Sequence, residues 1–114
     1  MAQAKTNLGF MHSNGLGVSK NVTKAVKWYT EASEQGNAMG QYNLALLYYN
    51  GKSVTQNYKT AIKWFTASAK QGYRASQYYL GLIYRHGEGV LQDYVKAHMW
   101  YNISGSNGEE KGKD

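Results

Sequence analysis

The chain repeats itself with a period of 36 residues, and this periodicity constrains its fold more than any other feature. Shifts of 36 and 72 residues bring six columns into identity across three copies. These columns are Leu8/Leu44/Leu80, Gly15/Gly51/Gly87, Val18/Val54/Val90, Ala25/Ala61/Ala97, Trp28/Trp64/Trp100 and Gly36/Gly72/Gly108. Because one such repeat cannot bury its own apolar face, three stacked repeats would form one continuous core. We therefore expect a single domain over residues 1–108, made of repeats 2–37, 38–73 and 74–108.

Each copy is predicted to fold as two helices joined by a tight turn. Small and apolar residues recur at three- and four-residue steps in Gly40, Leu44, Leu47 and Tyr48, which indicates a buried helical stripe. Glycines follow this stripe, and the chain contains no proline. The predicted first helices cover 2–13, 38–49 and 74–86, and the predicted second helices cover 22–35, 58–71 and 94–105. The expected fold class is all-α, an α/α superhelix (solenoid) of three helix–turn–helix repeats.

The ends of the second helices carry their own signals. Their predicted N-caps are Asn21, Asn57 and Asp93. Gly36 and Gly72 suit the left-handed position that ends a helix. Ser53 replaces the second loop glycine of the other copies, so we expect strain there if that position needs a positive φ. The three tryptophans are predicted to fill the space between helices, and truncating a buried one to alanine should cost about 3–5 kcal/mol.

The third copy carries the clearest family resemblance. It reads Ser76-Gln77-Tyr78-Tyr79-Leu80-Gly81-Leu82-Ile83-Tyr84, then Gly87-Glu88-Gly89-Val90, Asp93, Lys96-Ala97 and Trp100-Tyr101. This pattern resembles the signature of the Sel-one-like repeat (SLR) family, a relative of the tetratricopeptide repeat (TPR) family. The resemblance covers residues 2–108. It implies a superhelix whose first helices line a concave face, and a scaffold or adaptor that binds a partner peptide or helix there.

The TPR analogy also points to residues for this concave face. Carried over by register, the partner-binding candidates are Phe10, Tyr42, Asn43, Leu46, Tyr49, Tyr78, Tyr79, Leu82 and Arg85. Tyr and Arg are typical anchors of protein interfaces. We expect Tyr49, Tyr79 and Arg85 to be exposed, so that their replacement by alanine weakens binding and barely changes the melting temperature. Leu46 and Leu82 are equally suited to contact a partner or to pack between neighbouring first helices.

Charge and composition bear on the other classes of function. The formal net charge is +6, and the basic excess lies in residues 1–87, which favours an acidic protein partner. An alternative is a basic solenoid that binds nucleic acid, although the lysines are peripheral to the tyrosine-rich strip. We expect no enzyme, metal site or cofactor, because the chain has no cysteine, its seven acids are scattered and its three histidines occupy different columns. No apolar run approaches the roughly 20 residues of a membrane span.

The C-terminal end of the repeat array is predicted to lack a cover. The second helix of the third copy carries the apolar residues Tyr94, Val95, Met99, Trp100, Tyr101 and Ile103. Residues 109–114 are polar and are expected to form a flexible tail. A further alternative is therefore an uncapped fragment of a larger multi-repeat protein with a structural role. In either case we expect this end to self-associate or to accept a helix from another molecule.

Overall fold

The computed structural model describes residues 2–3, 5–7, 22–51 and 54–112, and most of them are helical. Residues 2–3 and 5–7 are helical and precede α2 (Val22–Glu34), α3 (Ala38–Asn50), α4 (Tyr58–Lys70), α5 (Arg74–His86) and α6 (Tyr94–Gly112). No strand occurs among the described residues. The predicted all-α fold of three helix–turn–helix repeats is confirmed. No helix in these ranges is both long enough and apolar enough to cross a membrane.

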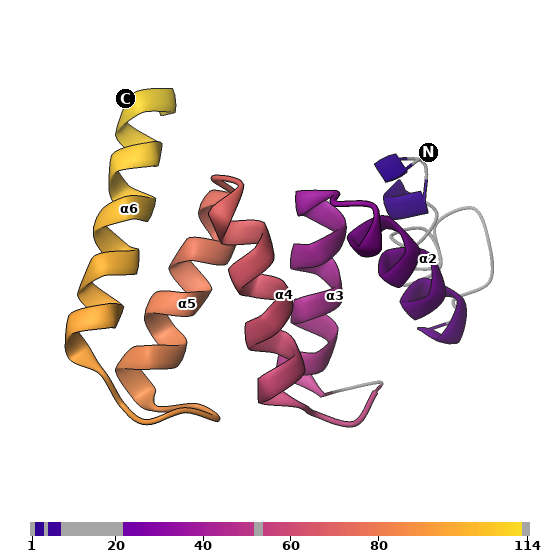
Figure 1. Cartoon of the computed structure of the whole chain (residues 1–114), viewed down its shortest axis with the longest axis horizontal. Coiled ribbons are helices and arrows are strands. Elements are labelled where there is room, and N and C mark those ends of the chain that lie inside the picture. Colours follow the sequence, from indigo (N-terminus) through magenta and orange to yellow (C-terminus); the bar gives the residue numbers. More distant parts are fainter. Residues whose placement is uncertain (1, 4, 8–21, 52–53, 113–114) are drawn as a thin grey trace.

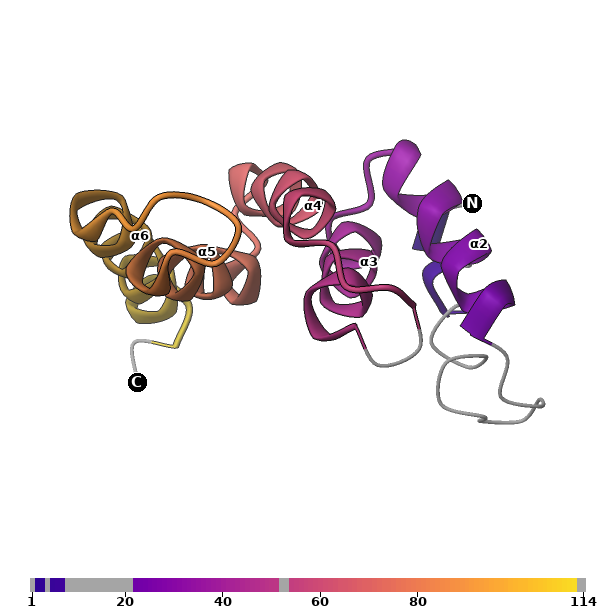
Figure 2. The same ribbon diagram turned by 90° about the horizontal axis from the view of Figure 1, so that it is seen from below.

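Successive helices pack against each other in chain order. Contacts join α2 to α3, α3 to α4, α4 to α5 and α5 to α6, which makes an extended row of helices (Figure 1). Seen from below, the row runs across the view, with α4 beside α3 and α6 beside α5 at the end away from α2 (Figure 2). Such a row is what a stack of helix pairs produces when each pair covers the apolar face of the next.

Several predicted helix ends are present in the structure. Asn57 Oδ1 accepts a hydrogen bond from the Thr60 amide at 3.0 Å, and Asp93 Oδ1 accepts one from the Lys96 amide at the same distance. Gly36 and Gly72 have φ values of 89° and 91°, the left-handed conformation expected after a helix. The cap at Asn21 and the strain at Ser53 lie outside the described residues. Gly89, which occupies the column of Ser53 in the third copy, has a φ of 77°.

The sequence analysis missed the cap of α3. Asn37 Oδ1 accepts a hydrogen bond from the Gly40 amide at 2.7 Å, and Thr6 Oγ1 donates to the same oxygen at 3.0 Å. Thr6 is buried and belongs to the first repeat. This cap therefore also links the first repeat to the second.

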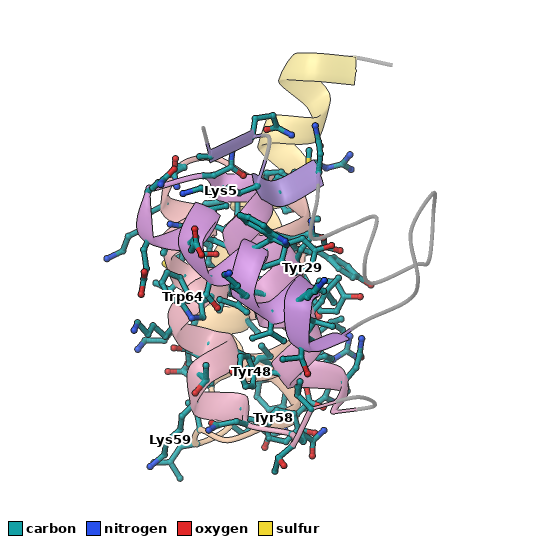
Figure 3. The ribbon with its side chains drawn as sticks, turned by 90° about the vertical axis from the view of Figure 1, so that its right-hand side faces the viewer. Lys5, Tyr29, Tyr48, Tyr58, Lys59 and Trp64 are labelled. Atoms are coloured by element: carbon teal, nitrogen blue, oxygen red, sulfur yellow. The ribbon has the colours of Figure 1, made fainter. Side chains whose placement is uncertain are left out.

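The core consists of two clusters of buried side chains. The larger one joins Phe65, Leu80 and Ile83 with three buried alanines, Ala45, Ala61 and Ala69. The smaller one contains Ala25, Tyr29 and Leu44. Trp64 packs against both clusters, and Figure 3 shows it in the view that also labels Tyr29. All three members of the alanine column, Ala25, Ala61 and Ala97, are buried.

The three tryptophans are less buried than the sequence predicts. Each is half-buried, whereas Phe65, the residue after Trp64, is completely buried. Successive residues differ by about 100° around a helix, so only one of two adjacent aromatic side chains can point into the centre of the contact. The Trp64 ring lies towards the edge, where the Lys63 ammonium sits 4.6 Å from the ring centroid.

The last helix is longer than predicted. It was expected to end near residue 105 and to be followed by a flexible tail over 109–114. Instead, α6 continues to Gly112 (Figure 1). Isolated glycines in a helix cost only about 1 kcal/mol each, and no proline follows to stop the helix. Residues 113–114 lie outside the described part of the chain.

Candidate functional site

Four aromatic side chains form a cluster between α3, α4 and α5. The Tyr79 ring stacks on the Phe65 ring with a centroid distance of 5.1 Å and an interplanar angle of 4°. Tyr42 and Tyr49 flank this stack, with centroids 6.0 and 5.5 Å from Tyr79. We call these four residues the inner aromatic cluster. Aromatic pairs at such distances add stabilisation beyond the apolar area they bury.

The predicted exposure of Tyr49 and Tyr79 is wrong. Both are half-buried and pack against the larger core cluster, as does Leu46. Their rings span the gap between the neighbouring first helices and reach Phe65 on α4. Replacing either tyrosine by alanine would remove contacts with the core as well as accessible surface. We therefore expect both substitutions to lower the melting temperature.

Tyr49 also fixes the loop that follows α5. Its hydroxyl donates a hydrogen bond to Glu88 Oε1 at 2.8 Å, and its ring lies 5.7 Å from that of Tyr58. Burial, and next the hydrogen bond to the Glu88 carboxylate, raise the pKa of Tyr49. Gly89 in the same loop lies against Tyr58, where an added Cβ would approach the Tyr58 Cβ to 2.4 Å. The loop of the third repeat is therefore held on the second repeat.

The buried tyrosines make stability depend on alkaline pH. Burial raises the pKa of Tyr29 from 10.0 to about 12, because the phenolate is poorly solvated in the core. Because the pKa of Tyr29 is higher in the folded state, its neutral phenol contributes fully to the free energy of unfolding below pH 10. This contribution is lost as the pH rises towards 12. We expect Tyr29→Phe to flatten the decline in unfolding free energy between pH 10 and 12, measured by urea titration. Tyr94→Phe, at an exposed ring, is the control; an equal flattening there would contradict this assignment.

The remaining predicted site residues differ in exposure. Tyr78 keeps 50 % of its surface exposed, and Arg85 is also exposed. Asn43 and Leu82 are half-buried, and Phe10 lies outside the described residues. Tyr78, Leu82 and Arg85 follow one another at steps of four and three residues, so they share one face of α5. The structure thus separates the predicted strip into an inner packed part and an outer accessible part.

The accessible part continues onto α6. A shallow hollow of about 260 Å³ is lined by Arg85, Tyr94, Ala97, His98 and Tyr101. A second one, of about 400 Å³, is lined by Arg74, Ala75, Tyr78 and Ser104. On α6 the lining residues recur at three- and four-residue steps, and on α5 Tyr78 and Arg85 are seven residues, or two turns, apart, so the two hollows border the same side of the helix pair. We call the two hollows together the α5–α6 groove.

The α6 side of this groove was missed by the sequence analysis. The sequence analysis treated Tyr94 and Tyr101 only as apolar residues of the last helix, and it treated His98 only as one of three histidines in different columns. The signal that could have found them is the 36-residue register, which relates Tyr94 to Tyr58 and Tyr101 to Phe65. Among the described residues, no group of three or more His, Cys, Asp and Glu side chains is arranged to hold a metal ion.

Comparison with known proteins identifies the repeats. The model of the Sel1 repeat matches residues 2–37, 38–73 and 74–109. The sel1-like repeat-containing protein L18 of Acanthamoeba polyphaga mimivirus is 41% identical over 39 residues, which cover 34% of this chain and 7% of the viral protein. The L21 protein of the same virus gives the same identity and coverage.

Solved structures share the whole fold. The crystal structure of a Sel1 repeat protein from Oxalobacter formigenes superimposes with a TM-score of 0.90 at 32% identity, over 97% of this chain and 44% of that one. The protective antigen c5321 of uropathogenic Escherichia coli strains, which displays an SLR fold, gives 0.91 at 36% identity, over 94% and 23%. Cysteine rich protein B of Helicobacter pylori gives 0.79 at 20% identity, over 96% and 85%, and so shares the fold.

This chain therefore spans less than half of the first two solved structures and less than a tenth of the viral relatives. Its three matched repeats nevertheless account for nearly all of its own length. Together with the three helix–turn–helix repeats of the structure, they show that the chain belongs to the Sel1 repeat family, whose TPR-like helical repeats generally mediate protein interactions.

Proposed function

We propose that this chain is a non-catalytic interaction scaffold that binds a segment of another protein on the face lined by its first helices. The observation that carries the proposal is that Tyr78, which is half-exposed, and Arg85, which is exposed, lie on the same face of α5. Tyr and Arg are the side chains that most often anchor protein interfaces. The net charge of +6 favours an acidic segment as the partner.

The inner aromatic cluster supports this role by making the surface rigid. Tyr42 and Tyr49 hold α3 against Tyr79 of α5, so the two first helices keep a fixed spacing. Tyr78 is itself held by ring contacts with Tyr79 and Tyr101, at 6.2 and 5.8 Å. A preorganised anchor loses little conformational entropy when a partner binds, which favours affinity.

A displayed peptide library selected on the wild-type chain provides the test. We expect the selected binders to lose at least tenfold in affinity on Tyr78→Ala or Arg85→Ala, because a central anchor contributes about 1.4 kcal/mol or more. Fluorescence anisotropy measures the affinity, and thermal melts check that both variants remain folded.

Lys59→Ala is the matched control for the loss of a cation. Lys59 is exposed on α4, among the second helices, and is labelled in Figure 3. It should leave both affinity and melting temperature unchanged. Binders that respond equally to Lys59→Ala and Arg85→Ala, or to neither of the two anchor substitutions, would place the interaction elsewhere and contradict the proposal.

A further inference from the structure

The groove between α3 and α4 in the second repeat shows what such a groove accepts. It is filled by α5, whose Tyr79 ring stacks on Phe65 of α4 and contacts Tyr42 of α3. Two polar contacts set the register of α5 in this groove. Ser76 Oγ donates to Ser68 Oγ at 2.8 Å, and Gln77 Nε2 donates to the Ala69 carbonyl at 3.1 Å.

The same receiving surface recurs 36 residues later between α5 and α6. Tyr78 replaces Tyr42, and Tyr101 replaces Phe65. The ring pair keeps its geometry, since Tyr42 and Phe65 are 6.1 Å apart at 54°, and Tyr78 and Tyr101 are 5.8 Å apart at 47°.

The second-helix serine keeps its role as well. Ser68 Oγ donates to the Ala38 carbonyl at 2.8 Å, and Ser104 Oγ donates to the Arg74 carbonyl at 3.4 Å. The α5–α6 groove is therefore already shaped to receive a helix of the α5 type.

What differs between the two grooves is their cover. Tyr42 is half-buried because Tyr73 and Tyr79 lie against it, at 5.2 and 6.0 Å. Tyr78, in the equivalent position, is 50 % exposed and borders one of the two hollows. The ring of Tyr101 borders the other hollow. In the second repeat, the matching place above Phe65 holds the ring of Tyr79.

The charge of the α5–α6 groove specifies its occupant further. Arg85 stands in the column of Tyr49, whose hydroxyl donates to Glu88 in the loop after α5. A guanidinium at this place is a stronger donor to a carboxylate than a phenol is. None of the described residues that line the two hollows is acidic, and Arg74 and His98 are among them. The surface therefore suits a helix that is followed by an acidic residue, whose carboxylate can pair with Arg85.

We propose that the α5–α6 groove binds an amphipathic helix of another protein, with an aromatic ring that stacks on Tyr101 and a later carboxylate that pairs with Arg85. The α5 segment gives the spacing, because Glu88 comes nine residues after Tyr79. This inference rests on the proposed function and names the partner chemistry at the outer end of that face.

A second copy of this chain is a poorer occupant. Its N-terminal helical residues carry Lys5 and Asn7 in the columns of Gln77 and Tyr79. Asn7 offers no ring to stack on Tyr101, and Lys5 adds a cation to a groove already lined by Arg74 and Arg85. A second copy of this chain therefore lacks the ring that the proposal requires.

The test uses a labelled peptide with the sequence of residues 73–88, which is the helix that fills the groove of the second repeat. A hydrocarbon staple between peptide positions 78 and 82 keeps it helical, because these positions are four residues apart on one face of the helix, and it leaves Tyr79 free to stack. We expect saturable binding to the intact chain by fluorescence anisotropy. Tyr79→Ala in the peptide should weaken this binding at least tenfold.

Charge reversal then identifies the groove. Arg85→Glu in the chain should weaken binding of the peptide at least tenfold, and Glu88→Lys in the peptide should restore it. Lys59→Glu is the matched control and should leave binding unchanged. No binding of the stapled peptide, or binding that ignores the charge at Arg85, would overturn the inference; the latter result would mean that the peptide displaces α5 from its own groove.

The outcome is separable from that of the proposed function. Suppose that library binders depend on Tyr78 and Arg85 but the stapled peptide does not bind. The scaffold role would then be supported, and the proposal that its ligand is a helix would be rejected. Light scattering of the chain alone tests for self-association, and we expect a monomer. A dimer that Arg85→Glu dissociates would overturn the inference in favour of a second copy as the occupant.

Discussion

Phe65→Ala should lower the free energy of unfolding by about 3–5 kcal/mol, the range for a large aromatic side chain removed from a core. Phe65 is completely buried and contacts Tyr42, Tyr49 and Tyr79, so its loss opens a cavity that touches three helices. Trp64→Ala should cost less, because the Trp64 side chain is only half-buried. Urea denaturation with circular dichroism measures both variants.

The exposed Leu91 provides the control for this comparison. Its side chain is 90 % exposed, so Leu91→Ala should change the unfolding free energy by less than about 0.5 kcal/mol. A destabilisation by Trp64→Ala that equals or exceeds that of Phe65→Ala would show that the repeat-defining tryptophan, and not the residue after it, is the centre of the core.

Gly89→Ala is expected to lower the free energy of unfolding by about 2–4 kcal/mol. The residue has a φ of 77°, which costs an L-residue about 1–2 kcal/mol. In addition, the new Cβ would meet the Tyr58 Cβ at 2.4 Å, and such overpacking typically costs about 1–3 kcal/mol. The loop that Tyr49 holds through Glu88 would have to move.

Gly36→Ala separates these two contributions. Gly36 has a φ of 89°, yet no atom lies within 4 Å of the position of an added Cβ. It should therefore show the backbone cost alone, and Gly89→Ala should exceed it by the cost of the clash. Equal losses of stability in the two variants would mean that the loop relaxes away from Tyr58 without penalty.

The aromatic residues of this chain serve two separable purposes. Tyr42, Tyr49 and Tyr79 join the second repeat to the third around Phe65, and they are parts of the core. Tyr78 and Tyr101 keep the same mutual geometry as Tyr42 and Phe65 but border open hollows. One ring arrangement thus acts as internal packing in one repeat and offers a binding surface in the next.

The periodicity of the sequence was sufficient for the architecture. Leu44 and Leu80 share an invariant column and are both fully buried, and Asn57 and Asp93 both cap their helices. The caps depend on residues three positions apart, and the leucine column recurs because each repeat meets the same surface of the repeat before it, as Leu44 meets Ala25 and Tyr29. A 36-residue register places them correctly without any knowledge of how the repeats are oriented.

Polar contacts that cross between helices were not predictable in the same way. Ser68 on α4 donates a hydrogen bond to the carbonyl of Ala38, where α3 begins. Ser104 on α6 donates one to the carbonyl of Arg74, where α5 begins. Serine has no strong preference for such a position, so composition and spacing gave no reason to single it out. Only the observed distances reveal that these bonds repeat with the register.

By itself the sequence determined that this chain is a row of three helix pairs, where those pairs turn, and which columns are apolar. The tertiary structure decided which member of the Trp64–Phe65 pair faces the core, and that Tyr49 and Tyr79 are packing residues whereas Tyr78 and Arg85 are accessible. The physical reason is angular. A step of one residue turns a side chain by about 100°, so its environment depends on how neighbouring helices are rotated against each other, and that rotation is set by packing between repeats.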